Sequence, residues 1–155
     1  MIGTYLRAGL PSPQPTALDA PFWEGLRQGR LLLQRCRACE RFQWAPEWIC
    51  HRCLSFDLGY AEVEARGMIY SHERVWHPVH PALADNGPYV VVLVELLQAD
   101  GARIVGNLLG DPMQPLVIGA HIEGVFEHHT EHEPPFSLLQ WRMADKAGGS
   151  QVRLA

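Results

Sequence analysis

The stretch CRACERFQWAPEWICHRC, residues 36–53, decides the fold of the first third of the chain. It holds two Cys-x-x-Cys pairs, Cys36/Cys39 and Cys50/Cys53, with ten residues between them. Each pair presents two thiolates on a tight turn, and the loop between them folds the pairs into a tetrahedral cage of four sulfurs, the closed geometry of structural zinc. We therefore predict one structural Zn²⁺ per chain. These four are all the cysteines of the chain, so none is left to act as a nucleophile.

Two other kinds of site also use Cys-x-x-Cys pairs. A redox dithiol needs one pair with a low-pKa thiolate, usually at a helix start, whereas this chain has two matching pairs. A rubredoxin-type iron site has the same four ligands, so iron stays the alternative to zinc. A closed four-thiolate site has no open position for water or substrate, and its metal is expected to stabilise the fold rather than to catalyse a reaction.

A short amphipathic helix is expected upstream of the cysteines. Asp19 is suited to cap it with its side chain, Phe22 and Leu26 repeat at helical spacing, and Gly29 ends the run. Residues 31–34 then favour a strand that leads into the first cysteine pair.

Downstream of the cysteines, short runs of β-branched and aromatic residues alternate with Gly, Pro and Asn, a texture typical of an all-β domain. Strands are expected at residues 67–75, 89–97, 102–109, 121–128 and 136–141. Five strands suit a small barrel. The Ala99-Asp100-Gly101 link predicts a tight hairpin, because Asp-Gly readily adopts positive φ.

The chain of 155 residues suits one domain, or a small metal-stapled module beside a compact one. Residues 8–16 are rich in Pro and small residues, which favours an arm. We expect a flexible leader over 1–18, the helix and ribbon over 19–59, the barrel over 60–144 and a flexible tail over 145–155.

The distribution of hydrophobicity predicts a cytoplasmic protein without membrane contact. The longest apolar run spans the six residues 89–94, whereas a membrane-spanning helix needs about 20. The first residues lack the apolar core of a secretory signal.

Charge weighs against nucleic acid as a partner. The chain has a net charge of −4, but residues 60–141 carry 3 arginines, no lysine and 11 acidic residues, a net of −8. Phosphate polymers bind mainly through Lys and Arg. A single-stranded nucleic-acid-binding module is therefore kept only as an alternative, on the analogy of other zinc ribbons and barrels.

No catalytic set emerges from the remaining polar residues. Ser71 and His72 are neighbours on a predicted strand and face opposite sides, so they cannot form a dyad. The histidines of the EHHTEHE stretch, His128, His129 and His132, could be a second metal site, but we expect them to be solvated in an acid-rich loop.

Aromatic residues are concentrated in and before the ribbon. A zinc ribbon has too little interior for two tryptophans, and surface aromatic side chains commonly anchor protein interfaces. The predicted partner-binding residues are Phe22, Trp23, Trp44 and Trp48. Core packing is the alternative role for them.

The string FWEGLRQGRLLLQRCRAC, residues 22–39, followed by the second cysteine pair, resembles a known family. Further matching pieces are residues 67–70, the Gly-Pro-Tyr at 87–89 before the strand VVVLVEL, the GNLLG at 106–110 and the Ile-Gly at 118–119. The family is that of the rubredoxin-like zinc-ribbon plus OB-fold proteins of acyl-CoA metabolism, long catalogued as a domain of unknown function. The resemblance covers residues 19 to about 141. Two departures are Glu40, where the family usually has Gly, and residues 45–47, where it has Pro-Arg.

The resemblance implies a mainly β fold: an N-terminal helix, a rubredoxin-like zinc ribbon and a five-stranded OB-fold barrel. It implies a non-catalytic accessory subunit that forms a hetero-oligomer with a thiolase-fold large subunit. That large subunit would be a thiolase, an acyltransferase or a steroid side-chain retro-aldolase. Such a subunit is required by a complex that cleaves or forms C–C bonds of an acyl-CoA. Partnership with a MaoC-like enoyl-CoA hydratase is the alternative.

Arginines near the ribbon suggest contact with the phosphates of an acyl-CoA, because guanidinium groups bind phosphate through paired donors. The candidates are Arg35, Arg37 and Arg41. A solvated basic face is the alternative reading of these residues.

Overall fold

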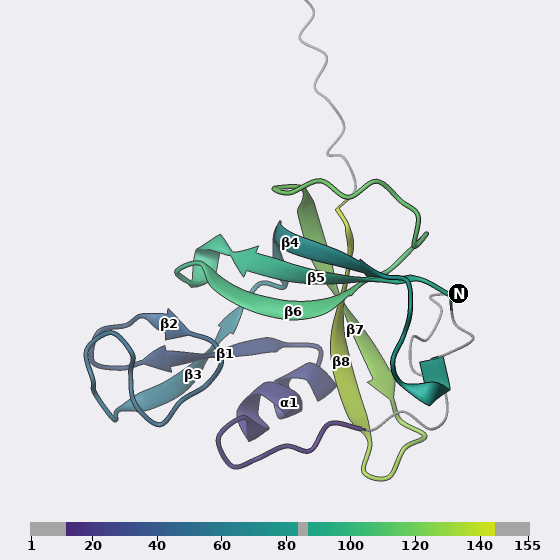
Figure 1. Ribbon diagram of the computed structural model, residues 1–155. Coiled ribbons are helices and arrows are strands. Elements are labelled where there is room, and N and C mark those ends of the chain that lie inside the picture. Colours follow the sequence, from purple (N-terminus) through teal and green to yellow (C-terminus); the bar gives the residue numbers. More distant parts are fainter. Residues whose placement is uncertain (1–11, 84–86, 145–155) are drawn as a thin grey trace, which may run out of the picture.

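The computed structural model describes residues 12–83 and 87–144 (Figure 1). Most of the predicted leader and the whole predicted tail lie outside these ranges. The chain forms α1 (Ala20–Arg27), β1 (Leu31–Cys36), β2 (Phe42–Gln43), β3 (Leu58–Val63), β4 (Arg66–Val75), η1 (Pro81–Leu83), β5 (Tyr89–Leu96), η2 (Leu97–Ala99), β6 (Ala102–Leu108), β7 (His121–His129) and β8 (Phe136–Met143), where η marks a short 3₁₀ helix.

The strands form two sheets. The ribbon sheet has the order β2-β1-β3, and the other five strands close into a barrel in the order β4-β5-β6-β8-β7. Figure 1 shows the ribbon sheet beside the barrel, with α1 lying next to β1 and β8, against both of which it packs. The predicted fold class is confirmed: a mainly β chain with an N-terminal helix, a ribbon and a five-stranded barrel.

The five predicted barrel strands are all present, with ends shifted by a few residues. The strands β2 and β3 of the ribbon were not predicted. β3 pairs with β1 along its whole length, from Leu31 opposite Val63 to Cys36 opposite Leu58. It therefore runs across position 59/60, where the ribbon was expected to end.

Asp19 does not cap α1 in the predicted way. No helix backbone N–H donates to its carboxylate. The carboxylate instead accepts from the backbone N–H of Thr16 at 2.6 Å, the Thr16 hydroxyl at 2.8 Å and the Trp23 indole at 3.0 Å. Two donors of Thr16 in the turn before the helix, and the indole of Trp23 within it, thus occupy the carboxylate in place of the helix backbone N–H groups. The helix ends as expected, with Gly29 at φ 70° shortly after its last residue.

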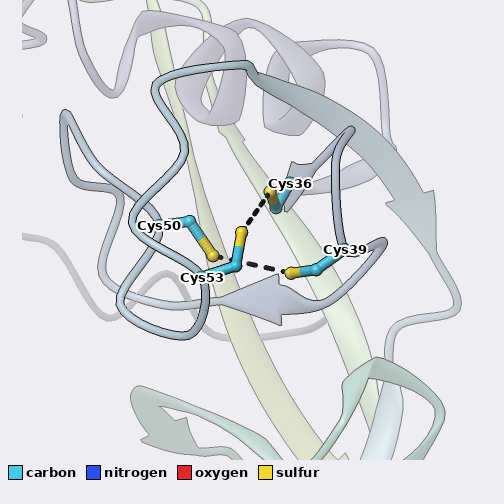
Figure 2. A group of neighbouring side chains, drawn as sticks. All are labelled: Cys36, Cys39, Cys50 and Cys53. Atoms are coloured by element: carbon cyan, nitrogen blue, oxygen red, sulfur yellow. Dashed lines mark hydrogen bonds between the residues drawn. The ribbon is translucent and has the colours of Figure 1, made fainter.

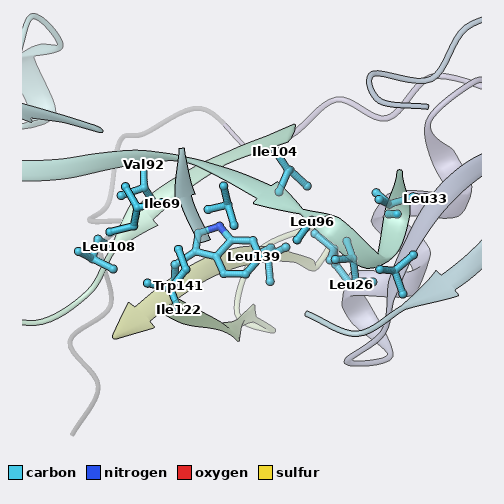
Figure 3. Close-up of a cluster of buried hydrophobic side chains, with 14 of the residues drawn as sticks. Leu26, Leu33, Ile69, Val92, Leu96, Ile104, Leu108, Ile122, Leu139 and Trp141 are labelled. Atoms are coloured by element: carbon cyan, nitrogen blue, oxygen red, sulfur yellow. The ribbon is translucent and has the colours of Figure 1, made fainter. Parts of the chain in front are cut away.

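One hydrophobic core joins the helix, the ribbon and the barrel (Figure 3). Trp141 of β8 is fully buried at its centre, and Leu26 of α1 and Leu33 of β1 close its ribbon side. The Trp141 ring lies directly over Gly106 of β6, where an added Cβ would come within 2.7 Å of the indole.

The link between β5 and β6 fastens the ribbon to the barrel. The two strands form the expected antiparallel hairpin, and Asp100 and Gly101 have φ of 55° and 75°. The connection also contains η2, so it is longer than predicted. The Asp100 carboxylate accepts from Arg41 at 2.6 Å and from the backbone N–H of Phe42 at 2.9 Å.

Within residues 12–83 and 87–144, no helix combines the length and the hydrophobicity that crossing a membrane would require.

Candidate metal centre and surrounding surfaces

The four cysteine sulfurs converge on one point between two loops of the ribbon (Figure 2). Sγ of Cys36 lies 3.6 Å from Sγ of Cys53, and Sγ of Cys39 lies 3.7 Å from Sγ of Cys50. A tetrahedral ion with metal–sulfur bonds of about 2.3 Å separates its ligands by about 3.8 Å. The four cysteines are therefore placed so that they could hold a metal ion, and their spacing and donor set fit zinc.

The two cysteine turns have the same backbone design. The N–H of Cys36 donates to the carbonyl of Arg41, and the N–H of Cys50 donates to the carbonyl of Ser55, both at 2.9 Å. The residue after each pair, Glu40 or Leu54, has φ near 60°. Glycine adopts this conformation most easily, so Glu40, noted above as a departure from the resembled pattern, stands at a position whose backbone favours glycine.

The four thiols influence one another's ionisation. The backbone N–H of Cys53, with a further contribution from that of Arg52, lowers the pKa of the Cys50 thiol to about 6. At Cys53 the Ser55 backbone N–H favours the thiolate, but burial and the neighbouring thiols outweigh it and raise the pKa to about 12. Like charges at this distance oppose one another, so all four groups would ionise together only with a positive charge between them.

Two buried glutamines hold the loop that carries the second cysteine pair, and the sequence analysis missed both. Gln43 donates to Oε1 of Gln34 at 2.6 Å, and Gln34 bonds both the N–H and the carbonyl of Glu47, each at 2.9 Å. Gln43 also accepts from the N–H of His51 at 3.1 Å. Their only sequence signal is a polar residue in an apolar strand pattern.

The four predicted partner-binding aromatic residues fall into two groups. Phe22 is buried, with its ring 4.4 Å from that of Trp44 and 5.0 Å from that of Trp23. Trp48 is separate and 68% exposed on the ribbon surface. Contact of these residues with a partner remains a prediction, and Trp48 is the most exposed of the four.

An open, mainly apolar cleft of about 610 Å³ lies between α1, the ribbon loop and barrel strands β5, β6 and β8. Trp23 and Trp44 line it, together with Tyr89 and Leu138 of the barrel. Phe22 lines it as well, so three of the four predicted partner-binding residues line a cleft rather than stand on a flat surface.

The three predicted CoA-binding arginines are all engaged within the chain. Arg37 pairs with Asp57 at 3.1 Å and Arg41 with Asp100 at 2.6 Å, while Arg35 donates to the backbone carbonyl of Glu40 at 2.8 Å. Arg35 and Arg37 share a small hollow of about 270 Å³ beside β3, and Arg41 lies outside it.

The histidines of the EHHTEHE stretch were expected to be solvated, but one of them is not. His129 is 1% exposed at the end of β7. Its burial follows from the pairing of β7 with β8, which lays the ring of Phe136 against it at 4.7 Å between centroids.

This fold and this cysteine site define a zinc-ribbon module joined to an OB-fold barrel. Family models described as the ChsH2 rubredoxin-like zinc ribbon domain and the ChsH2 C-terminal OB-fold domain match residues 23–59 and 60–127. A chain of the solved Ltp2-ChsH2(DUF35) aldolase has 35% sequence identity and a TM-score of 0.72, covering 85% of this chain and 98% of that one. The chain therefore belongs to the ChsH2 (DUF35) family, as the resemblance indicated.

Other relatives are described in different functional terms. A probable enoyl-CoA hydratase alpha subunit of Thermomonospora curvata is 42% identical over 102 residues, which are 65% of this chain but 31% of that relative. A DUF35 domain-containing scaffold protein of Methanocaldococcus jannaschii is 25% identical over 70% of this chain and 77% of its own length. A DUF35 structure from Sulfolobus solfataricus, with 16% identity and a TM-score of 0.56 over 83% of this chain and 86% of that one, supports the fold alone.

Proposed function

We propose that this chain is a non-catalytic accessory subunit that docks on a thiolase-like enzyme of acyl-CoA metabolism. The observation that carries the proposal is the similarity to a chain of the Ltp2-ChsH2(DUF35) aldolase over nearly the whole of that chain. The name of the archaeal scaffold relative agrees with a supporting role. Within the acyl-CoA class, the retro-aldol shortening of a steroid side chain is the preferred reaction of the complex, which acts in the cytoplasm.

The ribbon offers a surface suited to such docking. Trp48, Leu54 and Phe56 are 68%, 67% and 77% exposed, and they flank the second cysteine pair. Exposed aromatic side chains commonly dominate the binding energy of protein interfaces. We propose that this group of three residues, held in place by the metal site, contacts the large subunit.

Zinc is the proposed ion of the ribbon, with one ion per chain and a structural role. Elemental analysis of protein purified from its native cells would show zinc rather than iron, at no less than one ion per chain. A stoichiometric iron content, with visible absorption, would establish the rubredoxin-type alternative instead.

Arg35 and Arg37 are the better placed of the three proposed CoA contacts, because they share one hollow. Calorimetric titration with an acyl-CoA, on the chain alone and with its partner, tests this. The absence of binding heat in both titrations would contradict it.

Affinity capture from native cells tests the accessory role. The tagged chain is expected to recover a thiolase-like enzyme in stoichiometric amount. Trp48→Ala is expected to lower that recovery at least tenfold, whereas Trp76→Ala, a control for an exposed tryptophan after β4, leaves it unchanged. Recovery of nucleic acid, or of no protein, would overturn the accessory role. Equal recovery with both variants would overturn only the docking surface.

Partnership with an enoyl-CoA hydratase is the second candidate. The 42% identity to part of a probable hydratase alpha subunit favours it. Capture of a hydratase subunit in place of the thiolase-like enzyme would establish this candidate.

A further inference from the structure

The turn between β7 and β8 brings together metal-ligating side chains that lie outside the ribbon. His129, Glu131 and His132 offer ligand atoms that all lie within 4.8 Å of one another. Oε1 of Glu131 is 3.5 Å from Nδ1 of His129 and 3.7 Å from Nε2 of His132. A tetrahedral ion with bonds of about 2.1 Å to nitrogen and oxygen separates its ligands by about 3.4 Å. The two Glu131 distances are already close to this value, and the two imidazole nitrogens, which lie within 4.8 Å of one another, would have to approach by up to about 1.4 Å to complete such a site.

The surroundings of His129 resemble the support that proteins give to a metal-bound imidazole. Its Nε2, on the opposite side of the ring from Nδ1, lies 3.0 Å from Oε1 of Glu127, in ion-pair range but without the alignment of a hydrogen bond. Glu127 in turn accepts from Gln140 of β8 at 2.9 Å. When the ring N–H donates to such a carboxylate, the bond fixes the orientation of the ring and makes its other nitrogen a better donor to the metal; at His129 this bond would require a realignment of the two side chains.

The aromatic rings around the site, from β7, β8 and the turn between them, pack against one another. Phe136 stacks on His129 at 18° between ring planes, and His132 lies edge-on to both, with centroids 5.0 Å from Phe136 and 5.7 Å from His129. His128, which precedes His129 in the sequence, is not one of the three proposed ligands. Its Nδ1 lies 2.7 Å from the hydroxyl of Ser137 instead.

Exposure leaves room for a further ligand. The side chain of His129 is 1% exposed, that of His132 37% and that of Glu131 66%. An ion bound here would have protein ligands on its inner side and an open coordination position toward solvent.

We infer that the β7–β8 turn binds a divalent transition-metal ion through His129, Glu131 and His132. Two imidazoles and one carboxylate are a borderline donor set that favours zinc over magnesium or calcium, which prefer oxygen ligands alone. The alternative is that ion pairs and ring contacts alone hold these side chains together without a bound ion, and metal titration distinguishes the two.

The test is equilibrium dialysis of the full chain, purified without a polyhistidine tag, against buffered Zn²⁺. The chain is expected to bind two ions, the tighter in the ribbon and the weaker at the turn. Glu131→Gln and His132→Gln, at accessible positions where folding is spared, are expected to weaken the second ion by about 10-fold or more while the first stays bound. Glu133→Gln, the same change two residues along the turn, is the matched control and is expected to keep both ions.

Two further measurements separate the site from adventitious binding. Glu127→Gln, which removes the carboxylate behind His129 and alters its bond with Gln140 but leaves the three proposed ligands in place, is expected to weaken the second ion by about 10- to 100-fold. Cadmium NMR is expected to show one resonance typical of four sulfur ligands and a second typical of nitrogen and oxygen ligands. A single bound ion at saturating Zn²⁺ would overturn the inference. So would a second ion that Glu131→Gln and His132→Gln retain with unchanged affinity.

Discussion

Asp100 shows how one side chain can join two parts of a fold. It lies between η2 and β6 in the barrel, yet its carboxylate accepts from Arg41 and Phe42 of the ribbon. The backbone N–H of Phe42, followed by the Arg41 guanidinium, lowers the pKa of Asp100 below its ordinary value of 3.8. A group with a lowered pKa stabilises the fold above its unfolded pKa, and that stability is lost as the pH falls through the folded pKa.

Asp100→Asn is therefore expected to lower the free energy of unfolding at pH 7 by about 1 kcal/mol, because a charge-assisted contact at a partly exposed site is lost. Asparagine tolerates the left-handed backbone at this position, so the turn itself is preserved. Denaturant titrations would show the difference from the unaltered chain shrinking below about pH 4. Glu47→Gln, an exposed ribbon control, is expected to have little effect, and a constant difference down to pH 2 would contradict this role.

The residues that could be predicted from the sequence are those whose chemistry depends on local spacing. The four cysteines are of this kind, because two matching turns already specify the cage. Gln34, Gln43 and His129 were not predictable, because their burial and partners come from strands and loops that pair only in the folded chain.

At the scale of elements, the crossing of β6 and β8 depends on a missing side chain. Gly106 lets the indole of Trp141 lie directly on the β6 backbone, so that Trp141 fills the barrel interior. Packed interiors accommodate added atoms poorly, because the neighbours must leave their preferred rotamers.

Gly106→Ala is accordingly expected to destabilise the chain by about 1–3 kcal/mol, since its Cβ would meet both the ring of Trp141 and the carbonyl of Leu139 within 3 Å. Thermal unfolding followed by circular dichroism measures this. Gly59→Ala, whose Cβ would meet only the flexible end of Arg37, is the control and is expected to change stability by less than about 0.5 kcal/mol. Equal effects of the two changes would rule out the packing argument.

The barrel strands could be predicted because β-branched runs bounded by Gly and Pro carry a strong local signal. The ribbon strands could not. β2 has two residues, and β3 mixes apolar residues with Gly, Tyr and Glu and is recognisable as a strand only by its pairing with β1. Their form follows from the cysteine cage and from the neighbouring strand rather than from their own composition.

At the scale of the whole molecule, the metal site and the barrel share one core. Leu31 and Leu33 of β1, the strand that ends at Cys36, are buried in the same cluster as Trp141. Disorder of the cysteine loops would therefore loosen residues that also support the barrel.

Removal of the ribbon metal is expected to lower the stability of the entire chain. If Cys39→Ser costs about 4 kcal/mol of metal-linked folding energy, the Tm falls by roughly 10 °C. Hydrogen exchange would show faster exchange at the amides of β1 as well as in the cysteine loops, and added zinc would restore neither. Unchanged protection of β1 in the variant would show that the ribbon and the barrel unfold independently.

The path of β3 also bears on how this protein can be dissected in the laboratory. The two family matches meet at position 59/60, which invites expression of the ribbon and the barrel as separate pieces. A cut there divides β3 in two and exposes leucines of β1 that are buried in the intact chain. Each piece would then carry an unpaired strand edge that is prone to aggregation. Swaps between relatives that respect the packing should instead exchange the helix, the ribbon and all of β3 together, joining the chains at 64–65.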